Sequence, residues 1–276
     1  MTKKIKKEKN YIPLIKSNAA SKIFNTNIFY KLENLNPTGS HKDRECKYIL
    51  TKKNNFNYDS VGCASTGNLA ISLAYYAKKY NKKCHIWIKK NTPKKKIKIL
   101  KNFKSKIYIK NQSLNKLYLT SNKFMKRKNI LNLNPRINKD KIAANKIIGE
   151  EIINQNKKID LFVCTINNGS LFLGIYESIK KFKNKSLIGV YTYSKKASSI
   201  NGLNLNEDNK LLSKFKNNYR IKLIEAKESE IKKNEHIFYK DKLKLEYDCS
   251  SMLAVLKKID LKKFKNICCI LSGKKK

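Results

Sequence analysis

Residues 36–44 read Asn-Pro-Thr-Gly-Ser-His-Lys-Asp-Arg, and this stretch decides how the rest of the chain is interpreted. It follows an apolar and aromatic run at residues 28–33 that is typical of a strand. Asn-Pro and Thr-Gly then break the chain, and Ser40 is a favourable helix cap. This order predicts that Lys42 lies in the first turn of a helix. The positive helix end disfavours an ammonium there, so we expect an amine suited to forming an imine with a carbonyl group.

A second strand, turn and helix follow at residues 61–77. A run of small residues leads into Ser-Thr-Gly-Asn at residues 65–68, and an alanine-rich segment with helical spacing of apolar residues comes next. Backbone N–H groups at such a turn point outward and form a cradle for an anion. An ordinary helix cap would have the same sequence, so this motif is informative chiefly together with the first one.

The remaining elements alternate between strand and helix. Strands are predicted at residues 83–88 and 107–109, with a helix from Pro93 to about Phe103 between them. Another strand at residues 159–165 runs into a polar turn and a second apolar helix. This alternation predicts parallel sheets with helices on both faces.

Together, residues 36–44 and residues 65–68 resemble two motifs of the β-family, or fold type II, pyridoxal-phosphate enzymes, and threonine synthases in particular. The resemblance runs from about Tyr11 to Gly273. It implies an α/β fold of the tryptophan synthase β type, with two three-layer αβα domains, mostly parallel sheets and a cofactor cleft between them. The expected smaller domain spans 36–133, and the larger one combines 11–35 with 134–276.

The same resemblance implies which residues bind pyridoxal 5'-phosphate. Lys42 would hold the cofactor and then act as base and acid toward the substrate. Asn68 would contact the ring oxygen, and Ser272 would face the pyridine nitrogen. The implied loop for the cofactor phosphate, which has fewer glycines here than in the family, is Asn167, Asn168, Gly169 and Ser170.

Substrate groups are implied at two places. Ser65, Thr66 and Gly67 would contact the substrate carboxylate. Arg136 lies in a segment that resembles the start of the family's domain-crossing helix, and arginine is rare in this chain. Its planar fork suits a phosphate, so we predict Arg136 and Lys141 as ligands of a substrate phosphate.

The implied reaction converts O-phospho-L-homoserine and water to L-threonine and phosphate by γ-elimination and β-hydration. Two alternatives stay open within the fold: a serine or threonine dehydratase, and an enzyme similar to cysteine synthase. A third is a decayed relative without cofactor. His41 departs from the phenylalanine that threonine synthases commonly carry before the lysine, and we assign it no catalytic role.

The net charge of +43 raises a different hypothesis, a nucleic-acid-binding protein. The lysines, however, are spread along the whole chain, and Lys, Asn, Ile, Tyr and Phe are abundant together. An AT-rich genome produces this composition. Aromatic stacking motifs and zinc spacings are absent from the sequence. We therefore predict a small phosphorylated amino acid as the partner and no specific nucleic acid.

Cysteine usage and the N-terminus bear on the compartment. None of the seven cysteines forms a C-x-x-C pair, and most lie in apolar runs, so buried reduced thiols and no metal site are expected. The lysine-rich start does not resemble a secretory signal, and no apolar run reaches membrane-spanning length. These features favour the cytoplasm. The biased composition suggests a host-restricted bacterium, with an organelle matrix as the less favoured alternative, and the resemblance implies a homodimer.

Overall fold

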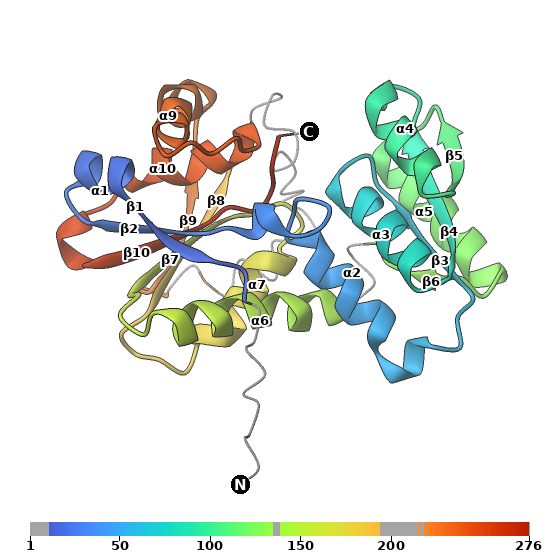
Figure 1. The fold of residues 1–276 in the computed structure, drawn as a ribbon, viewed down its shortest axis with the longest axis horizontal. Coiled ribbons are helices and arrows are strands. Elements are labelled where there is room, and N and C mark those ends of the chain that lie inside the picture. Colours follow the sequence, from blue (N-terminus) through green and yellow to red (C-terminus); the bar gives the residue numbers. More distant parts are fainter. Residues whose placement is uncertain (1–10, 135–138, 194–214, 216–217, 276) are drawn as a thin grey trace, which may run out of the picture.

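The chain forms two β-sheets, each in its own lobe (Figure 1). This computed structural model describes residues 11–134, 139–193, 215 and 218–275. The larger sheet has the order β1-β2-β10-β7-β8-β9 and the smaller one β5-β4-β3-β6. All neighbouring strands are parallel except β1 and β2. The strands of the larger sheet are β1 (Leu14–Ser17), β2 (Asn27–Lys31), β7 (Leu161–Thr165), β8 (Ser186–Tyr191), β9 (Ile221–Glu225) and β10 (Asn266–Ile270).

Helices cover both faces of the larger sheet. On one face lie α6 (Asp140–Gln155) and α7 (Ser170–Ile179), and on the other α1 (Asn18–Phe24), α9 (Glu228–Lys240) and α10 (Ser250–Leu256) (Figure 1). The strands are almost continuously apolar because both faces are buried; β7, for example, has no exposed residue. Each face therefore has its own hydrophobic core.

The smaller sheet is also covered on both sides. Its strands are β3 (Ser60–Ala64), β4 (Lys83–Lys89), β5 (Lys106–Lys110) and β6 (Leu131–Asn132). Helices α2 (Lys42–Thr51), α3 (Asn68–Lys79) and α4 (Lys94–Asn102) share one core with it, and α5 (Leu114–Arg127) packs on the opposite face. The predicted α/β class with two mostly parallel sheets is thus confirmed.

Helix α2 joins the two lobes, because it contacts α3 on one side and α6 on the other (Figure 1). It begins at Lys42, as the sequence predicts, but Ser40 does not cap it. The cap position is His41, and the buried Ser40 hydroxyl has no hydrogen-bond partner. The backbone at Ser40 forms a β-bridge to Gly273. Ser40 is therefore still extended, and the cap position falls one residue later, at His41. The domain limits at 36–133 remain a prediction.

Close packing of α6 on α7 depends on glycine. A Cβ atom added to Gly174 of α7 would lie 2.5 Å from the Cβ of Asn145 and 2.7 Å from its carbonyl carbon. Backbone cannot yield as a flexible side chain can. Helices that pack at this distance need a residue without a side chain at the contact.

We therefore expect Gly174→Ala to lower the free energy of unfolding by about 1–3 kcal/mol, because overpacking outweighs the gain in helix propensity. Urea unfolding followed by circular dichroism measures it. Gly67→Ala is the control, since nothing lies within 4 Å of its added Cβ. A Gly174→Ala protein as stable as the Gly67→Ala protein would contradict this packing.

Candidate active site

Lys42 is buried at the start of α2 and faces the start of α7. Its side-chain amine lies 2.7 Å from Glu45 Oε1 and 3.5 Å from Ser170 Oγ. Only 7% of Lys42 is exposed. Two strand–turn–helix units that are far apart in the sequence thus meet at this amine.

The turn before α7 contains the loop predicted from the sequence to hold the cofactor phosphate. Gly169 has φ +85°, a left-handed conformation that glycine adopts without strain. The Asn168 side chain accepts a hydrogen bond from Ser170 N at 3.1 Å and so satisfies one N–H group of the helix start. Asn167 is exposed, whereas Ser170 is buried with its hydroxyl directed into the protein. The single glycine stands where the backbone requires one.

Glu45, which the sequence analysis did not single out, is the centre of this cluster. Its Oε1 accepts hydrogen bonds from Lys42 Nζ at 2.7 Å, Ser170 Oγ at 2.7 Å and Asn145 Nδ2 at 2.8 Å. Burial alone would raise the pKa of this carboxyl group. The positive charges of Lys42 and Lys141 outweigh burial and lower the pKa to about 2. Glu45 is therefore a buried carboxylate at neutral pH.

Lys141 lies on the other side of the same carboxylate. Its amine donates a hydrogen bond to the Leu133 carbonyl and lies 3.8 Å from Glu45 Oε2. Burial lowers the pKa of Lys141, against the opposing attraction of Glu45. Only 1% of this residue is exposed. Arg136, the other predicted ligand of a substrate phosphate, lies outside the described residues.

The C-terminal segment around Ser272 contacts the start of α2 at His41. The Ser272 carbonyl accepts a hydrogen bond from His41 N at 3.1 Å and lies 3.2 Å from His41 Nδ1. Burial and the charge of Lys42 lower the pKa of His41 to about 4, so its imidazole is neutral at pH 7. The Ser272 hydroxyl lies 3.4 Å from the Thr165 hydroxyl at the end of β7.

The Ser-Thr-Gly-Asn turn approaches this C-terminal segment from the smaller lobe. The Asn68 amide donates to both carboxylate oxygens of Glu246 at 3.1 Å. A Cβ atom on Gly273 would meet the Glu246 carboxylate and the Asn68 amide, so these three residues are adjacent. Ser65, Thr66 and Gly67 are half-buried, and Ser65 Oγ accepts from Gly67 N at 3.2 Å. Glu246 is the second charged residue here that the sequence analysis missed.

Four charged side chains fix α2 against β2 and α6. Arg44 makes paired hydrogen bonds to Glu33 at 3.1 and 2.9 Å and to Glu151 at 2.5 and 2.8 Å. Lys31, which is fully buried, donates to Glu151 at 2.8 Å. Because Arg44 is two residues from Lys42, this network holds the site lysine in place.

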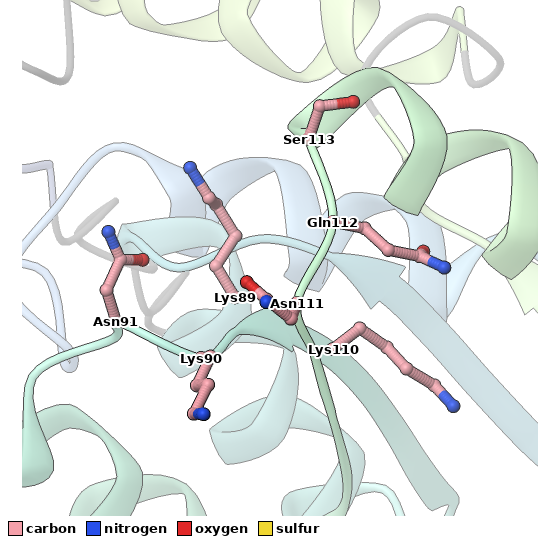
Figure 2. Close-up of a pocket in the computed structure, with 7 residues that line it drawn as sticks. All are labelled: Lys89, Lys90, Asn91, Lys110, Asn111, Gln112 and Ser113. Atoms are coloured by element: carbon pink, nitrogen blue, oxygen red, sulfur yellow. The ribbon is translucent and has the colours of Figure 1, made fainter.

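A surface hollow lies at the carboxyl ends of β4 and β5 (Figure 2). It encloses about 380 Å³, and none of the predicted site residues lines it. Its lining residues are Lys89, Lys90, Asn91, Lys110, Asn111, Gln112 and Ser113. The hollow is therefore distinct from the cluster around Lys42.

All seven cysteines are buried and free, as expected. Over the residues described, no three His, Cys, Asp or Glu side chains gather in a way that could hold a metal ion. In that same part of the chain, no helix combines the length and apolar character that crossing a membrane requires.

Comparison with known proteins identifies the family. A model of the family "Pyridoxal-phosphate dependent enzyme" matches residues 5–273. Threonine synthase of Methanocaldococcus jannaschii is 29% identical over 58% of this chain and 40% of its own length. Catabolic L-threonine dehydratase of Staphylococcus aureus is 28% identical over 64% of this chain and 52% of its own. The chain thus matches about half, or less, of these curated relatives' length.

The structure of maize serine racemase has a similar fold. It superimposes with a TM-score of 0.84 at 18% identity and covers 95% of this chain and 88% of that one. At this identity the likeness concerns the fold alone. Since the family model covers nearly the entire sequence and the fold agrees, the chain belongs to the pyridoxal-phosphate dependent enzymes.

Proposed function

We propose that this protein is a threonine synthase, which converts O-phospho-L-homoserine and water to L-threonine and phosphate. The observation that carries the proposal is the buried Lys42 amine, 3.5 Å from Ser170 Oγ at the start of α7. A lysine beside an anion-binding helix start is what a phosphorylated carbonyl cofactor needs.

The residues present fit pyridoxal phosphate in most respects. Lys42 would bind its carbonyl group, and the loop from Asn167 to Ser170 would hold its phosphate. The buried Ser40 hydroxyl, which has no partner, lies in the turn that precedes Lys42 and is free to donate a hydrogen bond. The cofactor, when bound, supplies an electron sink for the substrate carbon atoms. One group conflicts with this arrangement: the Glu45 carboxylate accepts a hydrogen bond from the Ser170 hydroxyl, where the phosphate would bind.

Among the buried groups, Lys42 is the proposed proton carrier. Glu45 is a weak base because its pKa is lowered to about 2 by Lys42 and Lys141, against burial. His41 is neutral, and both its backbone N and its Nδ1 face the Ser272 carbonyl, so its proposed role is to orient the C-terminal segment. Ser272, whose hydroxyl lies 3.4 Å from the Thr165 hydroxyl, would face the pyridine nitrogen of the cofactor.

A threonine or serine dehydratase is the second candidate, because the dehydratase of S. aureus matches a larger share of this chain than the threonine synthase does. The two differ in the need for a substrate phosphate site. Lys141 is buried with its amine bound to the Leu133 carbonyl, so Arg136 is the proposed phosphate ligand.

Product analysis separates the candidates. Purified protein with added pyridoxal phosphate is incubated with O-phosphohomoserine, threonine, serine, or O-acetylserine plus sulfide. A threonine synthase releases phosphate and threonine in equal amounts from the first substrate. A dehydratase releases ammonia and a 2-oxo acid from threonine or serine, and a cysteine synthase forms cysteine. Product from none of the four would overturn the proposed function.

A further inference from the structure

The Glu45 carboxylate lies where an anionic ligand of α7 would bind. It accepts the hydroxyl proton of Ser170 at 2.7 Å, at the start of a ten-residue helix. It also accepts from Lys42 and Asn145 through the same oxygen atom. Glu45 is 0% exposed, and no hydrogen bond reaches its second oxygen.

We propose that Glu45 is a built-in competitor for the cofactor phosphate, which must displace its carboxylate from Ser170 before pyridoxal phosphate can bind. This inference rests on the proposed function, since it takes the loop before α7 as the phosphate site. It adds a residue that controls how tightly that site is occupied.

Hydrogen-bond capacity makes Glu45 and a phosphate compete for Ser170. A serine hydroxyl donates one hydrogen bond, and the Ser170 hydroxyl already donates to Glu45. Asn168 already accepts from Ser170 N, so the first N–H group of α7 is also occupied. A phosphate that approached Ser170 would find neither of these two donors free.

Charge has the same effect. A carboxylate and a phosphate repel each other strongly inside a protein, where the effective dielectric constant is low. The cations that would attract a phosphate, Lys42 and Lys141, lie 2.7 and 3.8 Å from Glu45, which already offsets one of their two charges. Glu45 thus occupies the Ser170 hydroxyl and offsets part of the positive charge of the site.

The same carboxylate holds the lysine that would bind the cofactor carbonyl. Lys42 and Glu45 lie three residues apart on α2, on one face of the helix, so their pairing needs no other element. Movement of Glu45 away from Ser170 would release the hydroxyl and the amine together. The groups proposed to bind the cofactor phosphate and the cofactor carbonyl would therefore become available together.

The test is the affinity for pyridoxal phosphate, measured by equilibrium dialysis. Glu45→Gln keeps the shape of the side chain and removes its charge, so we expect its dissociation constant to be lower than that of the unmodified protein by about tenfold or more. Glu45→Asp withdraws the carboxylate from Ser170 and should give an intermediate value. The matched control is Glu150→Gln, which removes one exposed charge on α6 and should change nothing.

Inorganic phosphate provides a second readout that needs neither the lysine reaction nor turnover. Phosphate should raise the melting temperature of the Glu45→Gln protein and leave that of the unmodified protein unchanged. Should the Gln variant fail to fold, the Asp variant, which retains a counter-ion for Lys42, carries the comparison. Equal dissociation constants for the unmodified, Asp and Gln proteins would overturn the inference.

The outcomes distinguish this inference from the proposed function. Turnover of O-phosphohomoserine with equal dissociation constants supports the function and rejects competition by Glu45. Tighter binding by Glu45→Gln without any product supports the competition and rejects threonine synthase. If no variant binds pyridoxal phosphate or inorganic phosphate, both are wrong.

Discussion

Replacing Lys42 with alanine should abolish the visible absorbance that pyridoxal phosphate acquires on bonding to a lysine, and should lower turnover by about 10³-fold or more. The physical reason is that the variant loses both the amine that bonds the cofactor carbonyl and the proposed proton carrier. Glu45 cannot replace it, because its pKa is lowered to about 2 by nearby lysines despite burial. Absorbance spectra with added cofactor and single-turnover kinetics measure the two losses.

Lys47→Ala is the matched control for this experiment. Lys47 lies on the same helix, but it is exposed, so both the spectrum and the rate should stay unchanged. A Lys42→Ala protein that keeps the absorbance band would show that another of the many lysines holds the cofactor. That result would reject the role proposed for the start of α2.

The second large effect concerns stability. Arg44→Ala should lower the free energy of unfolding by about 3–5 kcal/mol, because it leaves buried carboxylates without their partner. Glu33 is 0% exposed, and its two oxygens accept from Arg44 at 2.9 and 3.1 Å. Glu151 keeps only Lys31 among the cations of the network. Urea unfolding measures the change, and Arg44→Lys should restore part of it, since lysine supplies the charge without the planar fork.

Lys52→Ala serves as the comparison, because it breaks an exposed ion pair with Asp140 on the surface. Exposed pairs contribute little to stability, so this variant should unfold close to the unmodified protein. If Arg44→Ala and Lys52→Ala were equally stable, the buried network would not be what holds α2 in place.

Acid should reduce the difference between the Arg44→Ala and unmodified proteins. Burial alone would raise the pKa of Glu151, but Arg44 and Lys31 outweigh it and hold that pKa below its usual 4.5. A carboxyl group with a lowered pKa stabilises the folded state above pH 4.5, and this contribution is lost as the pH falls through the folded pKa. Repeating the urea titrations from pH 6 downward tests the sign of this dependence.

The local elements could be predicted because their signals are contiguous. Alternating strand and helix patterns predict parallel sheets, and the chain forms two of them with helices on both faces. The turn at residues 36–44 predicts that a helix starts near Lys42, where α2 begins. Only the cap was wrong, since the bridge from Ser40 to Gly273 joins residues at opposite ends of the sequence.

The charged residues of the site could not be predicted in the same way. Glu45 appears in the sequence as one of several charged residues on a helix, and its role depends on Ser170 and Asn145, which are 125 and 100 positions away. Glu246 likewise acquires meaning only beside Asn68 and Gly273. The one usable signal was the spacing of three residues between Lys42 and Glu45, which places them on one helix face.

The sequence by itself determined the order of strands and helices, the family, and the lysine at a helix start, because each depends on neighbouring residues. Tertiary structure alone decided which charges surround that lysine. Parallel strands bring their carboxyl ends to one edge of a sheet, and α2 crosses between the lobes, so side chains from distant segments meet there. Burial then makes their charges interact strongly, and neither distance nor burial can be read from a string of residues.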